Sequence, residues 1–188
     1  MKKFLIFLIL IAALVAAYLW LAPRFTMQGG KPAVETSSNS PIPADWRVFN
    51  SEEFKLSFRY PPDWKVQEIE NGLWVLIPPG ESNPEKAPIS VNMQEALPYE
   101  RAVEEISTDL IDPQKREIKI GGYRGVRTEG MLRPELADGE SRFSAFTMLD
   151  RAGRLVSFDY IEFAAGPSGA KAVYEILLSS LAFDGGGI

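Results

Sequence analysis

The stretch FKLSFRYPPDWKV, Phe54 to Val66, decides the fold class. Apolar residues stand at every second position of residues 54–60, which predicts a strand with one packed face and one wet face. Pro61 and Pro62 have no amide hydrogen for a sheet ladder, so they end that strand. Alternation resumes at Trp64. The stretch therefore predicts a strand, a proline corner and a second strand.

The sequence on either side of this corner predicts more strands of the same kind. The second strand, at about 64–69, turns at Asn71-Gly72, a pair favoured in type I′ hairpins, into LWVLIP at 73–78. Upstream, IPADWRV at 42–48 shares the pattern Pro-x-Asp-Trp-x-Val with YPPDWKV. We interpret this similarity as a second, independent proline corner that leads into a strand, rather than as a duplication.

The rest of the chain predicts an α+β fold built on an antiparallel sheet. A strand is expected over 89–93, and a helix begins near Pro98, is amphipathic through Leu110 and is closed by Asp112-Pro113. A second helix is expected to start with Ser168 as its cap and to run to about residue 180. Between the two helices we expect a four-stranded meander over 116–120, 123–131, 142–150 and 154–163. Two helices provide too few crossovers for a parallel sheet, so the sheet is expected to be antiparallel. The two amphipathic helices are the available cover for the apolar faces of this sheet.

Composition excludes several kinds of chemistry. The chain has 188 residues and contains neither cysteine nor histidine, which removes disulfides, thiolate and imidazole catalysis, and zinc sites built on those side chains. Of the 20 Lys and Arg residues, four precede Ala44, as does one of the 25 Asp and Glu residues, so the remainder carries a net charge of −8. This negative net charge argues against binding to nucleic acid. No cofactor is expected.

The first 23 residues predict a membrane anchor or a signal sequence. Lys2 and Lys3 precede an uninterrupted apolar run of 19 residues, 4–22, which is about 28 Å of helix and close to the hydrocarbon thickness of a bilayer. The two lysines favour a cytoplasmic N-terminus, with the rest of the chain outside the cell membrane. The alternative is a signal peptide cleaved near Ala17, which would release a secreted protein.

The remaining sequence divides into a linker, one domain and a tail. Residues 24–44 are rich in Gly, Pro, Ser and Thr without apolar periodicity, which is typical of a flexible linker. We expect one globular domain over 45–183 and a glycine-rich tail over 184–188.

The domain resembles the PsbP-like family, which includes the extrinsic lumenal subunit of photosystem II, bacterial DcrB-type envelope proteins and a eukaryotic Ran-binding import factor. WRVFNSEEFKLSFRYPPDW at 46–64 carries the resemblance, and GGYRGV, LVSFDYIEF and the closing LSSLAF support it over roughly 45–183. The resemblance implies a sheet sandwiched by helices that acts as a non-catalytic accessory or binding module. Because this chain has an apparent anchor and no histidine, no ion site, photosystem role or Ran binding is carried over.

Two places in the sequence are candidate sites. In the loop RPELADGE, the carboxylates of Glu135, Asp138 and Glu140 could converge on a hard cation. Their spacing is not that of an EF-hand, and a solvated hairpin loop explains them better, so no metal site is expected there. Trp74 alternates with Leu73 and Val75, so it faces the side opposite to them. It is expected either to pack under a helix or to be exposed for a partner.

Together these features predict a membrane-anchored, extracytoplasmic and non-catalytic module that binds another protein of the cell envelope. The main alternative is a carboxylate-dependent enzyme such as a glycan hydrolase, for which two carboxylates about 5–10 Å apart across an aromatic cleft are expected. A cleaved and secreted binding protein is the third reading of the same sequence.

Overall fold

The computed structural model describes residues 41–93, 98–137, 139, 142–151, 154–164 and 166–184. The elements within these ranges are mostly strands, with two α-helices and two short 3-10 turns. Their bounds are β1 (Arg47–Ser51), β2 (Leu56–Tyr60), β3 (Lys65–Glu70), β4 (Leu73–Ile77), η1 (Pro84–Lys86), β5 (Ile89–Asn92), α2 (Tyr99–Asp109), β6 (Leu110–Ile120), β7 (Tyr123–Leu132), η2 (Pro134–Leu136), β8 (Arg142–Arg151), β9 (Arg154–Ile161), α3 (Ala170–Ser179) and β10 (Ala182–Phe183).

The strands form two antiparallel sheets. The large sheet has seven strands in the order β3-β4-β5-β9-β8-β7-β6, and the small one has three in the order β1-β2-β10. Strands β6 to β9 pair in sequence order, which confirms the predicted meander. Strand β9, the last strand of the meander, also pairs with β5, so it joins the meander to strands β3 to β5.

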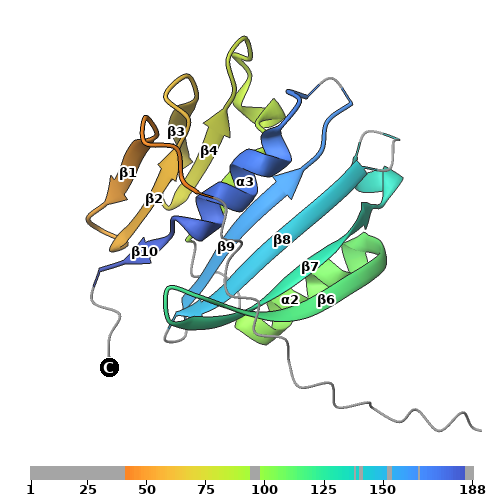
Figure 1. Cartoon of the computed structure of the whole chain (residues 1–188). Helices are drawn as coiled ribbons and strands as arrows, with labels where there is room; N and C mark the ends of the chain where they lie inside the picture. Colours follow the sequence, from red (N-terminus) through yellow and green to blue (C-terminus); the bar gives the residue numbers. More distant parts are fainter. Residues whose placement is uncertain are drawn as a thin grey trace, which may run out of the picture. The chain divides into compact units, whose positions relative to one another are not determined.

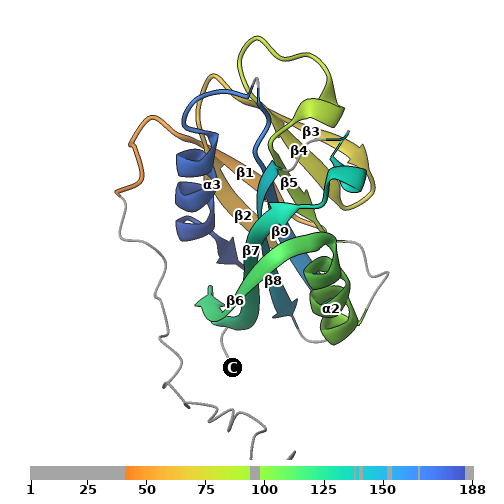
Figure 2. The ribbon, with the colours of Figure 1, turned by 90° about the vertical axis from the view of Figure 1, so that its right-hand side faces the viewer.

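The two helices lie on opposite faces of the large sheet, as Figure 2 shows. Helix α2 packs on β6, β7 and β8 over a small apolar cluster that includes Phe146 and Met148. Helix α3 and the small sheet cover the other face over the larger core, and in Figure 1 α3 lies in front of the large sheet, between β4 and β9. The predicted α+β class, with an antiparallel sheet between helices, is therefore what the described residues form.

The proline corner carries the chain from the small sheet to the large one. Strand β2 ends at Tyr60, and β3 begins at Lys65 in the other sheet. Within the corner, the Trp64 amide donates to the Pro61 carbonyl oxygen at 3.1 Å. The upstream corner has the same geometry, since the amide of Trp46 donates to the carbonyl of Pro43 at 3.2 Å and β1 follows at once. Both proline corners predicted from the sequence are confirmed.

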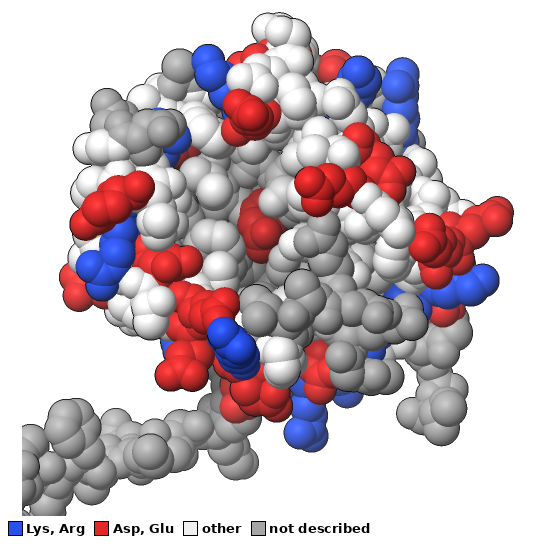
Figure 3. Space-filling model, turned by 180° about the vertical axis from the view of Figure 1, so that it is seen from behind, with Lys and Arg blue, Asp and Glu red and all other residues white. Residues whose placement is uncertain are grey.

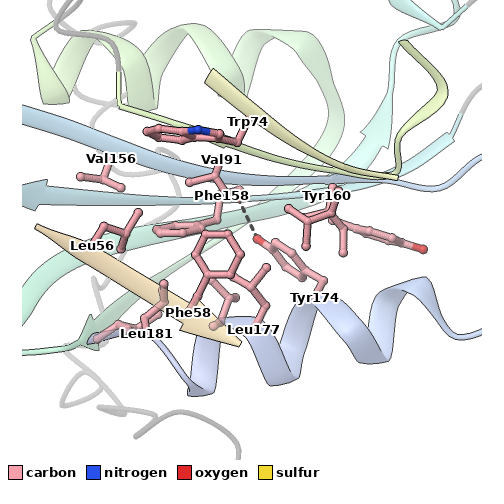
Figure 4. Packing of buried hydrophobic residues seen from close by; sticks show 14 of the residues in the cluster. Leu56, Phe58, Trp74, Val91, Val156, Phe158, Tyr160, Tyr174, Leu177 and Leu181 are labelled. Atoms are coloured by element: carbon pink, nitrogen blue, oxygen red, sulfur yellow. Dashed lines mark hydrogen bonds between the residues drawn. The ribbon is translucent and has the colours of Figure 1, made fainter. Parts of the chain in front are cut away.

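The larger core centres on Tyr174 of α3, whose side chain points into the sheet in Figure 4. Its hydroxyl lies 2.7 Å from the Thr147 hydroxyl and donates to the carbonyl oxygen of Phe158 at 2.9 Å. The ring packs among buried apolar residues of β2, β5 and β9. A fully buried hydroxyl needs such partners because an unpaired one costs about 1–3 kcal/mol.

Three local predictions differ from the structure. At the β3–β4 turn only Gly72 has a positive φ, whereas a type I′ turn needs positive φ at both central residues; the pairing is instead irregular between Glu68 and Glu70. Helix α3 begins at Ala170 after Gly169 in the left-handed region, without a side-chain cap, so the capping role predicted for Ser168 is wrong. Glycine adopts this backbone conformation at no steric cost.

The third difference concerns the end of α2. The helix stops at Asp109, and β6 begins at Leu110, so Asp112 and Pro113 lie inside a strand rather than closing a helix. The β6–β7 register shifts between Ile111 and Gln114, and Asp112 has φ +50°. Because β6 is an edge strand, a proline without an amide hydrogen is tolerated at such an irregularity.

Within the described ranges, no helix is both long and apolar enough to cross a bilayer. The predicted anchor or signal sequence at 1–23 lies outside those ranges, as do linker residues 24–40 and tail residues 185–188.

Candidate functional site

The loop proposed as a cation site is described only in part. Glu135 lies in η2 and is exposed, while Asp138 and Glu140 are outside the described residues. In the part of the chain that is described, no three side chains of His, Cys, Asp or Glu are grouped so as to hold a metal ion.

Trp74 lies in the core. Its side chain is 5% exposed and faces the α3 side of the large sheet. The rings of Phe49 and Phe54 contact it edge-on, with centroids 5.4 and 5.3 Å away. The sequence left two positions open for Trp74, packed under a helix or exposed. The structure has the indole packed, but beneath the small sheet rather than a helix, so it offers no exposed surface to a partner. Trp64 is also buried, and Trp46 is half-buried.

The opposite face of the large sheet carries a recessed carboxyl group at Asp159. In β9 the residues on either side of it, Phe158 and Tyr160, point into the α3-side core, so Asp159 faces the α2 side. Its direct neighbours across the sheet are Ser90 of β5 and Phe146 of β8. Taken as a whole, the residue is half-buried. We call Ser90, Ser157 and Asp159 the β9 recess.

Hydroxyl groups are the hydrogen-bond partners of this carboxyl. The Ser157 and Ser90 hydroxyls donate to Asp159 Oδ2 at 3.3 and 3.4 Å, which are long distances for such bonds. Surrounding protein removes most of the hydration that a carboxylate needs, and this burial raises the pKa of Asp159 to about 7, although both serine hydrogen bonds lower it. The carboxyl therefore exchanges its proton near neutral pH.

The face that carries the recess is hollowed. Figure 3 views the molecule from the side opposite α3 and shows a hollow lined mainly by uncharged atoms, with an acidic side chain inside it and several more around the rim. Along the sheet, the row that contains Asp159 continues through Ser90 to Val75 in one direction and to Phe146 in the other. The recess thus places one carboxyl in a largely uncharged surface.

A second cleft lies on the same side, beside the start of α2. It has a volume of about 660 Å³ and is lined by Tyr99 and Glu100 of α2 and by Glu117 and Asp150 of the sheet, among others. Burial, followed by the charges of Asp150, Glu100 and Glu117, raises the pKa of the Tyr99 hydroxyl. Arg124 and Lys119 also line this cleft, so its charges are mixed.

A buried arginine on the α3 side fastens that helix to the sheet. Arg127 of β7 is 4% exposed, and its guanidinium donates to both carboxylate oxygens of Glu175 and to Glu129. It also lies over the Tyr174 ring, 5.3 Å from the centroid. Burial lowers the pKa of Arg127, but the hydrogen bond and charge of Glu175, with further negative charge nearby, outweigh burial and raise it. We interpret this network as structural because its hydrogen bonds connect α3 with β7.

Sequence reasoning did not identify Asp159 or Arg127. In LVSFDYIEF the alternation predicts a strand whose polar positions face water, and Asp159 stands at one of those positions. As the last strand of the predicted meander, 154–163 could equally have been an edge strand. Its central position comes from the pairing with β5, which no local pattern indicates.

No protein-family model matches the chain, and no curated protein matches it significantly. A crystal structure from Bacteroides thetaiotaomicron VPI-5482 is 16% identical, with a TM-score of 0.50; the match covers 77% of this chain and 50% of that one. The present chain thus spans about half the length of the Bacteroides protein. At this identity the similarity concerns the fold alone.

Two further solved structures are similar to this chain at lower TM-scores. The solution structure of cyanobacterial PsbP from Synechocystis sp. PCC 6803 is 14% identical, with a TM-score of 0.48, over 78% of this chain and 95% of that one. The Ran-binding protein Mog1p from Saccharomyces cerevisiae is 12% identical, with a TM-score of 0.44, over 73% and 95%.

Proposed function

We propose that this chain is a membrane-anchored, extracytoplasmic and non-catalytic module that binds another protein of the cell envelope. The observation that carries the proposal is the hollowed face beside α2, where the β9 recess holds the carboxyl of the half-buried Asp159. Holding a carboxyl there destabilises the folded chain, and such perturbed groups are frequent at functional sites. A surface of this kind suits a partner that covers it.

The N-terminal sequence supports the location. The apolar run of 19 residues after Lys2 and Lys3 has the length and the charge asymmetry of an anchor whose following domain is exported. Cleavage near Ala17 would give a secreted binding protein instead, and N-terminal sequencing of the mature chain separates the two. A chain that starts at Met1 in the membrane fraction supports the anchor, and a mature chain that starts near Tyr18 contradicts it.

The proposed binding is tested in the membranes of the host. Tagged full-length protein is crosslinked there, purified and analysed by mass spectrometry, and a variant lacking residues 1–23 serves as the control for location. We expect one protein to be enriched repeatedly with the full-length chain. If the chain recovers only itself despite good expression and crosslinking, the proposed function is wrong.

One observation favours the alternative, a carboxylate-dependent enzyme. The cleft beside α2 combines the Tyr99 ring with Glu117 and Asp150, so acidic groups and an aromatic surface line the same space. This candidate predicts hydrolysis of envelope glycans that is lost in both Glu117→Gln and Asp150→Asn. Glycan fragments released by the wild-type protein and absent from both variants would favour the enzyme over the binding module.

A further inference from the structure

The Asp159 carboxylate has an oxygen that the protein leaves open. Both serine hydroxyls donate to Oδ2, and among the described residues no donor contacts Oδ1. The ion pairs of the described ranges do not include Asp159 either. An ionised carboxylate in a poorly hydrated place is stabilised chiefly by a cation or by several hydrogen bonds, and here it has two long ones.

The groups that face Asp159 are uncharged on each packed element. Strand β5 contributes Ser90, and β8 contributes Phe146 and, next along, Met148. The buried residue of α2 is Ala102, and the helix's apolar side chains pack on the same cluster as these β8 residues. On the α3 side, burial raises the pKa of the Tyr174 hydroxyl, and the charge of Asp159, acting through the sheet, raises it further. No positive group of the described chain therefore compensates this carboxylate.

We infer that the β9 recess receives a lysine or arginine side chain of the protein partner. This inference rests on the proposed function and names the chemistry by which the partner is held. An ammonium or guanidinium group supplies the charge and the donors that Asp159 Oδ1 lacks, while the serine hydroxyls have lone pairs free to accept from the same cation.

Charge and geometry favour a basic side chain over a metal ion. Calcium takes six to eight oxygen ligands, whereas the recess offers one carboxylate and two hydroxyls, which suit the three donors of an ammonium group or the fork of a guanidinium. Acidic side chains also surround the hollow in Figure 3, and the chain from Ala44 onward carries a net charge of −8, both of which attract a basic surface.

The recess can be tested without the natural partner. Full-length protein labelled with ¹³C at the aspartate side chains is titrated by NMR in detergent micelles, and the Asp159→Asn variant identifies the signal. The titration is run in n-butylguanidinium chloride, a stand-in for an arginine side chain, and in NaCl of equal ionic strength. Because a cation binds the ionised form, the midpoint falls by about one pH unit when the probe is at ten times its Kd.

Two results of this titration would overturn the inference. Equal midpoints in n-butylguanidinium and NaCl would mean that the recess does not select an organic cation. A midpoint near 4 in NaCl alone would mean that water solvates the carboxyl as at an ordinary surface. The expected result is a titration midpoint of Asp159 near pH 7 in NaCl and a lower midpoint in n-butylguanidinium chloride of the same ionic strength.

Crosslinking to the natural partner provides a second, independent test. We expect the crosslinked partner to be lost from Asp159→Asn and retained by Asp63→Asn, which removes an exposed aspartate in the proline corner. Retention by both variants would overturn the assignment of the recess and leave the proposed function standing. Recovery of no partner with the wild-type chain would overturn both.

Discussion

Replacing Asp159 with asparagine is expected to stabilise the protein at high pH and to leave it almost unchanged at low pH. The pKa of this carboxyl is raised from 3.8 to about 7 on folding, a shift of roughly three units, or about 4 kcal/mol at 1.36 kcal/mol per unit. Below pH 3.8 both the folded and the unfolded chain carry the proton. Between pH 4 and 7 the unfolded chain loses it while the folded chain keeps it, so the wild type loses stability as pH rises.

Asparagine has nearly the shape of the protonated carboxyl and carries no charge, so the variant avoids that loss. Because Asp159 as a whole residue is only half-buried, we expect about 2 kcal/mol of the 4 kcal/mol upper limit to appear above pH 7. Urea unfolding of both proteins between pH 4 and 9 measures the difference, in which the contributions of all other carboxyl groups cancel. Asp63→Asn, at an exposed site, is the control.

The result that refutes this reasoning is a difference in stability between Asp159→Asn and wild type that stays constant across the pH range. A constant difference would mean that Asp159 has the same proton affinity in the folded and unfolded chains.

Three further changes test the packing of α3 and of the large sheet by urea unfolding. Tyr174→Phe removes a fully buried hydroxyl with several partners and is expected to lower the free energy of unfolding by about 2 kcal/mol. A decrease below about 0.5 kcal/mol, which is less than one net hydrogen bond contributes, would contradict these hydrogen bonds. Glu175→Gln removes a negative charge that pairs with the buried Arg127 guanidinium and should lower the free energy of unfolding by about 2–3 kcal/mol. Glu105→Gln, which breaks the exposed ion pair with Arg101, should lower it by less than about 0.5 kcal/mol. Equal losses in the two variants would show that burial does not strengthen the Arg127 ion pair. Gly125→Ala would place a methyl group against a carbonyl oxygen of β8 and is expected to cost more than about 3 kcal/mol, so a variant with wild-type stability would exclude this close approach.

Local sequence patterns predicted most of the elements because each depends on neighbouring residues. The proline corner at 61–64 and the meander strands follow from period-two alternation and turn residues. Strand β6 was misread because Asp112-Pro113 normally ends a helix, whereas here an edge strand accommodates the proline beside a left-handed Asp112. The type of the β3–β4 turn, in which only Gly72 has a positive φ, could not be predicted either, because turn type depends on how the two strands pair.

The arrangement of strands, and with it the candidate site, could not be predicted from local patterns. Asp159 and Ser90 are 69 residues apart, and only the pairing of β9 with β5 brings them together. The same alternation is compatible with a polar face in full contact with water. Arg127 was missed for a related reason, because nothing near it in sequence indicates that Glu175 of α3 lies over it.

The position of β9 has a consequence for how the chain matures. Strands β3–β5 and the first three strands of the meander, β6–β8, can each form from neighbouring residues. The large sheet is joined only when the last meander strand, β9, pairs with both β5 and β8. The helix that covers the larger core, α3, comes later still. A chain emerging N-terminus first therefore exposes the apolar surface around Trp74 until almost all of it has been made. We therefore expect the domain to fold only after most of it has been synthesised. Chains truncated before residue 154 are expected to aggregate or to be degraded rather than to accumulate as a smaller stable domain.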